Sequence, residues 1–182
     1  MRRPNFFSEF VYDRAAHIRG DEDRLRQLLD TGARIIPVWR SMSLLARLDQ
    51  PQALLLERVP PEEFINSDTG IVFLGLFGGV PHFAVDTGHA EDAPARLGGE
   101  IADLRDIGGH LAPEEASVLA HARAMVYWHE RHRFCGVCGS PTIVRDAGHR
   151  RDCTNPDCGT PHFPRTDPAV IMLIHRGDHC LL

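Results

Sequence analysis

Four cysteines near the C-terminal end of the chain constrain its fold more than any other feature. They form two pairs, Cys135-x2-Cys138 and Cys153-x4-Cys158, with fourteen residues between the pairs. A tight turn between paired cysteines aims two sulfurs at one point, and structural Zn²⁺ takes four such ligands in a tetrahedron. We therefore predict that Cys135, Cys138, Cys153 and Cys158 bind one structural Zn²⁺. Two disulfides or a rubredoxin-like iron site are the alternatives that the spacing leaves open.

The residues between the two cysteine pairs predict a short hairpin. Thr142–Val144 and His149–Arg151 flank the turn sequence Asp146-Ala147-Gly148. This arrangement is typical of a zinc ribbon. Few apolar residues surround it, so the metal has to hold the unit together.

Polar residues next to the cysteines leave their roles more open. His129 and His132 have helical spacing just before the first cysteine, and four thiolates already complete a zinc shell. We expect exposed histidines at a helix end rather than ligands. Five arginines surround the cysteines and form either a phosphate-attracting patch or a solvated rim: Arg131, Arg133, Arg145, Arg150 and Arg151.

Composition narrows the class of protein. The chain has 182 residues, 43% of them hydrophobic and 25% charged, which suits one ordinary domain with a small metal module. All 20 basic residues are arginine, and the net charge of −5 gives no overall nucleic-acid footprint. No apolar signal segment follows Met1, and the longest apolar stretch, Gly70–Val80, is too short to span a membrane. We expect a cytoplasmic protein without a membrane partner, with Cys180 as a buried free thiol.

The part of the chain before the cysteines predicts a largely antiparallel sheet with two helices. Leu25, Leu28 and Leu29 give helical spacing within 21–30. A longer helix begins at Pro113 and runs almost to Phe134. Its apolar stripe, expected to pack in the core, is Val118, Leu119, Ala122, Met125 and Val126. Short strands are expected at 34–39, 43–48, 53–58, 71–76 and 82–86.

A continuous apolar run follows the ribbon. Residues 169–174 are of the kind buried on both faces of a sheet, and 176–179 predict a hairpin turn before Cys180. Because chains rarely stop inside a buried strand, we expect this to be the first hairpin of a truncated domain.

Three runs around the cysteines resemble the NADH pyrophosphatase family, the zinc-ribbon Nudix hydrolases of the NudC type. They are Trp128-His-Glu-Arg-His-Arg-Phe-Cys-Gly-Val-Cys-Gly139, His149-Arg-Arg-Asp-Cys153 and Phe163-Pro-Arg-Thr-Asp-Pro-Ala-Val-Ile171. The resemblance is strong from about 104 to 182, and weaker but compatible before that. It implies an α+β protein with a non-catalytic Nudix-like domain of mostly antiparallel sheet at 1–130. A zinc ribbon at 131–164 and the start of a truncated catalytic Nudix domain at 165–182 would follow.

The resemblance also implies an activity. Family members hydrolyse the pyrophosphate of NADH or NAD⁺ to a nicotinamide mononucleotide and AMP, and some remove NAD caps from RNA. They need Mg²⁺ or Mn²⁺ in the catalytic domain and commonly form homodimers. The metal-binding element of that domain, Gly-x5-Glu-x7-Arg-Glu-x2-Glu-Glu-x-Gly, does not occur in these 182 residues. We therefore assign no catalytic residue and expect this chain alone to be inactive.

Substrate contacts can be carried over at two positions. Arg105 matches a family arginine that contacts the dinucleotide, and Phe163 matches a family aromatic residue that contacts the substrate. A surface ion pair and packing beneath the ribbon are their respective structural alternatives. An acidic contact of the family, five positions before the third cysteine, falls on Gly148, so the chain departs from the family pattern here and this contact is not carried over.

Two other functions compete with the diphosphatase hypothesis. The chain could be a stand-alone zinc-ribbon module that binds RNA or a protein, which the local arginines favour and the net acidity opposes. It could also be a redox protein with iron in the four thiolates, which colour would reveal.

Overall fold

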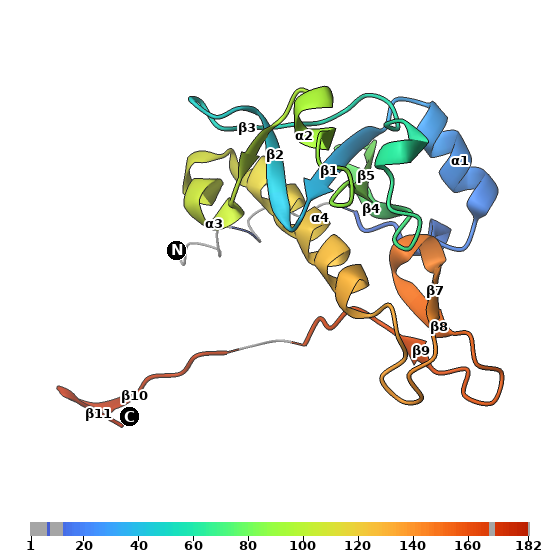
Figure 1. Cartoon of the computed structure of the whole chain (residues 1–182). Helices are drawn as coiled ribbons and strands as arrows, with labels where there is room; N and C mark the ends of the chain where they lie inside the picture. Colours follow the sequence, from blue (N-terminus) through green and yellow to red (C-terminus); the bar gives the residue numbers. More distant parts are fainter. Residues whose placement is uncertain (1–6, 8–12, 168–169, 182) are drawn as a thin grey trace.

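A mixed β-sheet forms the centre of the N-terminal part of the molecule (Figure 1). The computed structural model describes residue 7, residues 13–167 and residues 170–181. The strand order is β3-β2-β1-β5-β4, and β6 also pairs with β2. The strands are β1 (Arg34–Trp39), β2 (Met42–Arg47), β3 (Gln52–Ala53), β4 (Ile71–Phe77), β5 (Val80–Asp86) and β6 (Glu100–Ala102). Only β1 and β5 pair in parallel among these strands, which confirms the predicted, largely antiparallel sheet.

Helices cover both faces of this sheet. Side chains alternate along each strand, so Ile36 and Val72 pack with α4 (Pro113–Arg131), whereas Ile35 and Phe73 join the cluster of α1 (Glu22–Asp30). Coverage on both sides explains why these strands are continuous apolar runs. The predicted stripe of the long helix is buried as expected: Val118, Leu119, Ala122, Met125 and Val126.

Smaller elements connect the sheet to α4. They are α2 (Ala93–Arg96) and α3 (Leu104–Ile107), with 3₁₀ turns at Ala16–Ile18, Glu62–Phe64 and Gly108–His110. The strand expected at 53–58 is wrong, because β3 ends at Ala53. Beyond it, Leu56 only exchanges a pair of 2.8 Å backbone hydrogen bonds with Ile35. In the described part of the chain, no helix combines the length and the apolar character needed to cross a membrane.

The ribbon is a three-stranded antiparallel sheet beyond the end of α4 (Figure 1). Its strands are β7 (Thr142–Arg145), β8 (Arg150–Cys153) and β9 (Pro161–His162), with a 3₁₀ turn at Asp146–Gly148. Thr142 lies opposite Cys153 in the β7–β8 register. The predicted hairpin and the α+β class are both confirmed.

The C-terminal hairpin differs from its prediction. Strands β10 (Ile174–Arg176) and β11 (His179–Leu181) pair as expected, but residues 170–173 form no strand. The side chains expected to be buried are exposed, Ile171 fully so, and Cys180 is an exposed thiol. The reason is visible in Figure 1, where this hairpin stands away from the sheet and the ribbon. Residues 168–169 and 182, which belong to the segments of this prediction, lie outside the described residues.

Candidate metal centre and adjoining cavities

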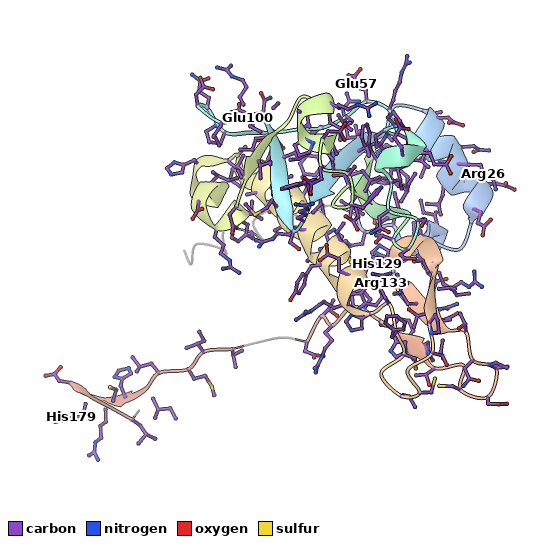
Figure 2. The ribbon with its side chains drawn as sticks, in the orientation of Figure 1. Arg26, Glu57, Glu100, His129, Arg133 and His179 are labelled. Atoms are coloured by element: carbon purple, nitrogen blue, oxygen red, sulfur yellow. The ribbon has the colours of Figure 1, made fainter. Side chains whose placement is uncertain are left out.

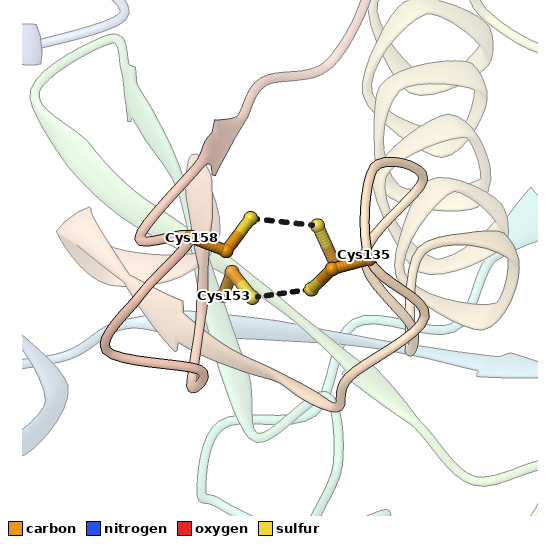
Figure 3. Close-up of side chains that lie close together, drawn as sticks. Cys135, Cys153 and Cys158 are labelled. Carbon is orange, nitrogen blue, oxygen red and sulfur yellow. Dashed lines mark hydrogen bonds between the residues drawn. The ribbon is translucent and has the colours of Figure 1, made fainter.

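Two loops bring the four cysteines together. Cys135 and Cys138 lie just after α4, in a turn closed by a 2.9 Å bond from the Gly139 amide to the Cys135 carbonyl. Gly139 has φ of 75°, a backbone conformation that glycine adopts without strain. Cys153 ends β8, and the Cys158 amide donates to the Asn155 carbonyl at 3.0 Å. The ribbon backbone therefore aims two sulfurs from each loop at one point (Figure 3).

The sulfur geometry fits one tetrahedral metal ion. All four Sγ atoms lie within 4.8 Å of one another. The Sγ atoms of Cys135 and Cys158 are 3.8 Å apart, and those of Cys138 and Cys153 are 3.4 Å apart. Zn–S bonds of about 2.3 Å in a tetrahedron place sulfurs about 3.8 Å apart. All four cysteines are free thiols, so the disulfide alternative is not realised and the set fits a structural Zn²⁺.

Neighbouring donors support negative charge on the sulfurs. The Val137 amide lies 3.4 Å from Cys135 Sγ, and His162 Nε2 lies 3.3 Å from the same atom. Hydrogen bonds from Ser140 lower the pKa of Cys138 to about 6, and the Thr160 hydroxyl lowers that of Cys158. Thiolates are the form that binds a metal, so these contacts favour metal binding at Cys138 and Cys158. Burial acts in the opposite direction at Cys153 and raises its pKa to about 12.

The two histidines before the first cysteine are not exposed, and that prediction was wrong. His129 is completely buried, and its Nε2 lies 2.9 Å from the Gly148 carbonyl in the ribbon. His132 is half-buried, stacks on Trp128 and bonds the Trp128 carbonyl at 2.7 Å. Burial wins because the end of α4 packs against the ribbon turn. Neither histidine belongs to the metal cluster found among the described residues.

The five arginines near the cysteines do not form a single free patch. Arg151 is only 2% exposed and lies inside the boundary between the ribbon and the sheet domain. Arg133 pairs with Asp68 at 2.7 Å, and Arg150 and Arg145 pair with ribbon carboxylates. Arg131 lies over the Tyr127 ring. Four of the five therefore already have acceptors within the chain, which weakens the phosphate-patch interpretation.

Two neighbouring cavities contain the predicted substrate contacts. Phe163 is 57% exposed and lines a cavity of about 700 Å³ against α4. Arg105 is exposed and lines a second cavity of about 440 Å³. Ala124 and Tyr127 of α4 line both cavities. Neither residue therefore takes its structural alternative: Phe163 is not packed away, and Arg105 has no ion pair among those of the described residues.

Gly148, where the resemblance places an acidic family contact, has no space for a side chain. Its φ is +92°, and a Cβ atom there would lie 2.7 Å from Val72 Cγ1. A carboxylate side chain has no space at this position. The turn instead packs its backbone directly on β4.

A second row of residues on α4, which lines the two cavities, was not identified from the sequence. Ala120, Ala124, Tyr127 and Arg131 follow helical spacing on a face outside the apolar core stripe, and each lines at least one of the two cavities. The spacing alone could have identified this face. Its cavities could not be anticipated, because their other walls come from residues distant in sequence, such as Arg14 and His149.

Comparison with known proteins places both parts of the chain. Residues 32–128 match the family model of the NADH pyrophosphatase-like rudimentary NUDIX domain, and residues 130–163 match that of the NADH pyrophosphatase zinc ribbon domain. These two matches agree with a structural zinc rather than iron in the cysteine cluster.

Three similar curated proteins are each longer than the region that this chain matches. The chain is 32% identical over 138 residues to a protein named NAD-capped RNA hydrolase NudC from Stutzerimonas stutzeri, covering 66% of this chain and 48% of that protein. It is 36% identical over 132 residues to Nudix hydrolase 19, chloroplastic, from Arabidopsis thaliana, covering 65% and 30%. It is 41% identical over 80 residues to human NAD-capped RNA hydrolase NUDT12, covering 40% and 17%. The chain thus spans about half or less of these relatives.

Proposed function

This chain belongs to the NADH pyrophosphatase-like NUDIX family, and from that premise we propose that it is the N-terminal and zinc-ribbon part of an NAD(H) diphosphatase. In that reaction water attacks one phosphorus atom of NADH or NAD⁺, and the P–O–P bridge breaks. The products are a nicotinamide mononucleotide and AMP. The observation that carries the proposal is the direct join, through α4, of a rudimentary NUDIX sheet to a four-cysteine ribbon.

The chain would contribute structure and substrate contacts rather than the hydrolytic step. The glutamates that hold Mg²⁺ or Mn²⁺ in Nudix enzymes belong to an element that these residues lack. Divalent ions would neutralise the pyrophosphate and activate water in a catalytic domain of the longer protein. The Zn²⁺ of the ribbon would be structural, since four thiolates leave it no open position.

Phe163 and Arg105 are the proposed substrate contacts of this part. An exposed aromatic face can stack on a base, and a guanidinium group can bind a phosphate in a bidentate manner. Their cavities share the wall formed by Ala124 and Tyr127, so one extended ligand could reach both. As in the family, we expect a homodimer in a reducing compartment such as the cytoplasm. The domain limits proposed are 1–130, 131–164 and 165–182.

NAD-capped RNA is a second candidate substrate. Relatives from Stutzerimonas stutzeri and human carry the name NAD-capped RNA hydrolase. Such a substrate presents the same dinucleotide, followed by an anionic strand. A stand-alone RNA-binding module receives less support, because most arginines around the ribbon are already paired or buried.

The test separates binding from hydrolysis. Zinc-loaded chain of verified length is titrated with NADH, NAD⁺ and AMP by calorimetry, and AMP release from NADH is followed in the presence of Mg²⁺ or Mn²⁺. We expect weak dinucleotide binding that is lost in Phe163→Ala and Arg105→Ala, and no hydrolysis. The matched control is Arg26→Ala on the exposed face of α1, a residue that lines neither cavity. Hydrolysis by the pure chain, or binding unaffected by both substitutions, would overturn the proposal.

A further inference from the structure

Hydrogen bonds cross the boundary between the ribbon and the sheet domain in both directions. His129 Nε2, on α4, lies 2.9 Å from the Gly148 carbonyl of the ribbon. His149 Nε2, in the ribbon, lies 2.6 Å from the Phe73 carbonyl of β4. Each part thus supplies one histidine that bonds a backbone carbonyl of the other. Figure 2 shows His129 close to the end of α4, beside the ribbon.

The partners of His129 fix its protonation state. A carbonyl oxygen only accepts, so Nε2 carries the hydrogen that bonds Gly148. The other ring nitrogen, Nδ1, lies 2.9 Å from Nη1 of Arg151, and a guanidinium group only donates. Nδ1 must therefore accept, which makes the ring neutral. His129 is fully buried and Arg151 is 2% exposed. Water therefore cannot screen the two positive charges from each other if His129 becomes protonated.

Arg151 forms hydrogen bonds to three segments of the chain at this boundary: α4, β7 and the loop before β4. Its Nε donates to Thr142 Oγ1 at 2.7 Å, and its Nη1 donates to the Asp68 carbonyl at 2.8 Å. Thr142 Oγ1 in turn donates to the His132 carbonyl at 2.6 Å, after the end of α4. A protonated His129 would face this cation directly, so repulsion would act where the two parts meet.

Other charges around the boundary do not offset this repulsion. The groups that face His129 are Arg151 on β8, His149 in the ribbon and His132 after α4. The carboxylate of Asp68 pairs with Arg133 at 2.7 Å and also faces Arg151, but it is not among the groups that act on His129. Burial, then Arg151, lowers the pKa of His129 to about 4, and burial lowers that of His149 to about 4. The groups around His149 are Arg14, Arg19, His121 and Asp146.

We propose that neutral His129 is a positioning residue that holds the ribbon on the sheet domain, and that its protonation releases the ribbon while both parts remain folded. The inference goes beyond the proposed function, because it concerns how the two parts are held and not what they bind. It also has a consequence for the larger cavity. Tyr127 and Trp128 on α4 and Phe163 and Pro164 at the end of the ribbon line the same cavity, so release would separate its walls.

The direction of the pH dependence follows from linkage. A histidine whose pKa falls from 6.5 to about 4 on docking contributes its full docking strength above pH 6.5 and loses it as the pH falls toward 4. Between pH 7.5 and pH 5 the docking equilibrium should weaken roughly 30-fold through His129.

The experiment uses the zinc-loaded 182-residue chain and hydrogen exchange measured by NMR between pH 7.5 and pH 5, with rates corrected for the intrinsic pH effect. Amides of 148–151 report on the boundary, and amides of β1 and β5 report on the sheet. The key variant is His129→Gln, whose amide can donate to Gly148 and accept from Arg151 but does not titrate. The matched control is His132→Gln, three residues later, where the histidine bonds only the carbonyl of its own helix.

Boundary protection should fall on acidification in the natural chain and in His132→Gln. In His129→Gln the fall should be roughly 30-fold smaller, because only the loss through His149 remains. Sheet protection should persist in all three. Loss of zinc in acid would affect all three chains alike and is followed with a chromogenic chelator. The proposal is overturned if His129→Gln shows the natural pH profile, or if sheet and boundary lose protection together. It is also overturned if ¹⁵N shifts of the natural His129 ring titrate near 6.5, a measurement that needs no variant.

Discussion

The sheet domain and the ribbon lie next to each other but are stabilised by different forces. The sheet is packed on both faces by buried apolar side chains, including Phe73, Ile35 and Leu119. Among the described residues of the ribbon, 133–163, the only buried residues of hydrophobic type are the metal-site cysteines Cys135 and Cys153. The sheet therefore depends on the hydrophobic effect, whereas the ribbon depends on its metal and on polar bonds such as those of Arg151. Perturbations that distinguish these two forces should affect one part at a time.

Removal of zinc should have the largest effect, and it should be confined to the ribbon. Chelation, or Cys153→Ser, removes a metal whose apparent binding energy is about 10–16 kcal/mol in comparable small zinc units. We expect NMR signals of 133–162 to collapse to unfolded positions while signals of β1 and β5 stay in place. A matched control is Cys180→Ser, an exposed thiol outside the cluster. Loss of the sheet signals on chelation would mean that the two parts are not independent.

Phe73→Ala should produce the converse result. Phe73 is fully buried and packs on Phe83 with ring centroids 5.1 Å apart. The cavity left by the substitution should lower the free energy of unfolding by about 3–5 kcal/mol. Urea denaturation checks this value, and zinc content by chelator assay should be unchanged. The same substitution at Phe163, which is largely exposed, should cost less than about 1 kcal/mol. An equal cost at both positions would contradict the division of forces.

Gly148→Ala tests the contact between the two parts. The new Cβ would lie 2.7 Å from Val72 Cγ1 and would also be strained by φ of +92°. Overpacking and a left-handed backbone together should cost about 2–4 kcal/mol, measured as lost exchange protection of 148–151. Gly136→Ala is the matched control in the same ribbon, with no atom within 4 Å of the new Cβ. If both variants behave alike, the close approach to β4 does not determine docking.

How far the sequence predicts each part also follows from these forces. The clustering of the four cysteines and the burial of the stripe from Val118 to Val126 were correctly predicted, because both follow from local patterns in the sequence. His129, Arg151 and Gly148 were not understood from the sequence, because their roles depend on contacts between segments far apart along the chain, as in the bond from Arg151 to the Asp68 carbonyl. In the sequence alone, a buried arginine that contacts a buried histidine cannot be distinguished from basic residues on an exposed surface.

The prediction for the C-terminal hairpin was wrong for a related reason. Its apolar side chains at 170–174 predict burial correctly as a tendency, but burial needs a partner surface, and composition cannot say whether one is present. In the structure Ile171 and Leu173 remain exposed, so the strand expected from 169 to 174 is reduced to Ile174–Arg176. The strand propensity was real only where β11 supplied a pairing partner.

The smallest predicted difference concerns ion pairs of the same kind in the two parts. Arg150 in the ribbon contacts Asp146 at 3.0 Å and Asp152 at 2.9 Å, and all three side chains are partly buried. Arg26 on α1 contacts Asp23 at 2.9 Å, but both side chains are largely exposed to screening water. We expect Arg150→Gln to weaken zinc binding about fivefold, equivalent to about 1 kcal/mol, without moving the urea midpoint of the sheet. Arg26→Gln should change either quantity by less than about 0.5 kcal/mol. A fivefold effect at Arg26, or none at Arg150, would show that exposure does not separate these pairs. The ribbon would then depend on its zinc more exclusively than its network of polar bonds indicates.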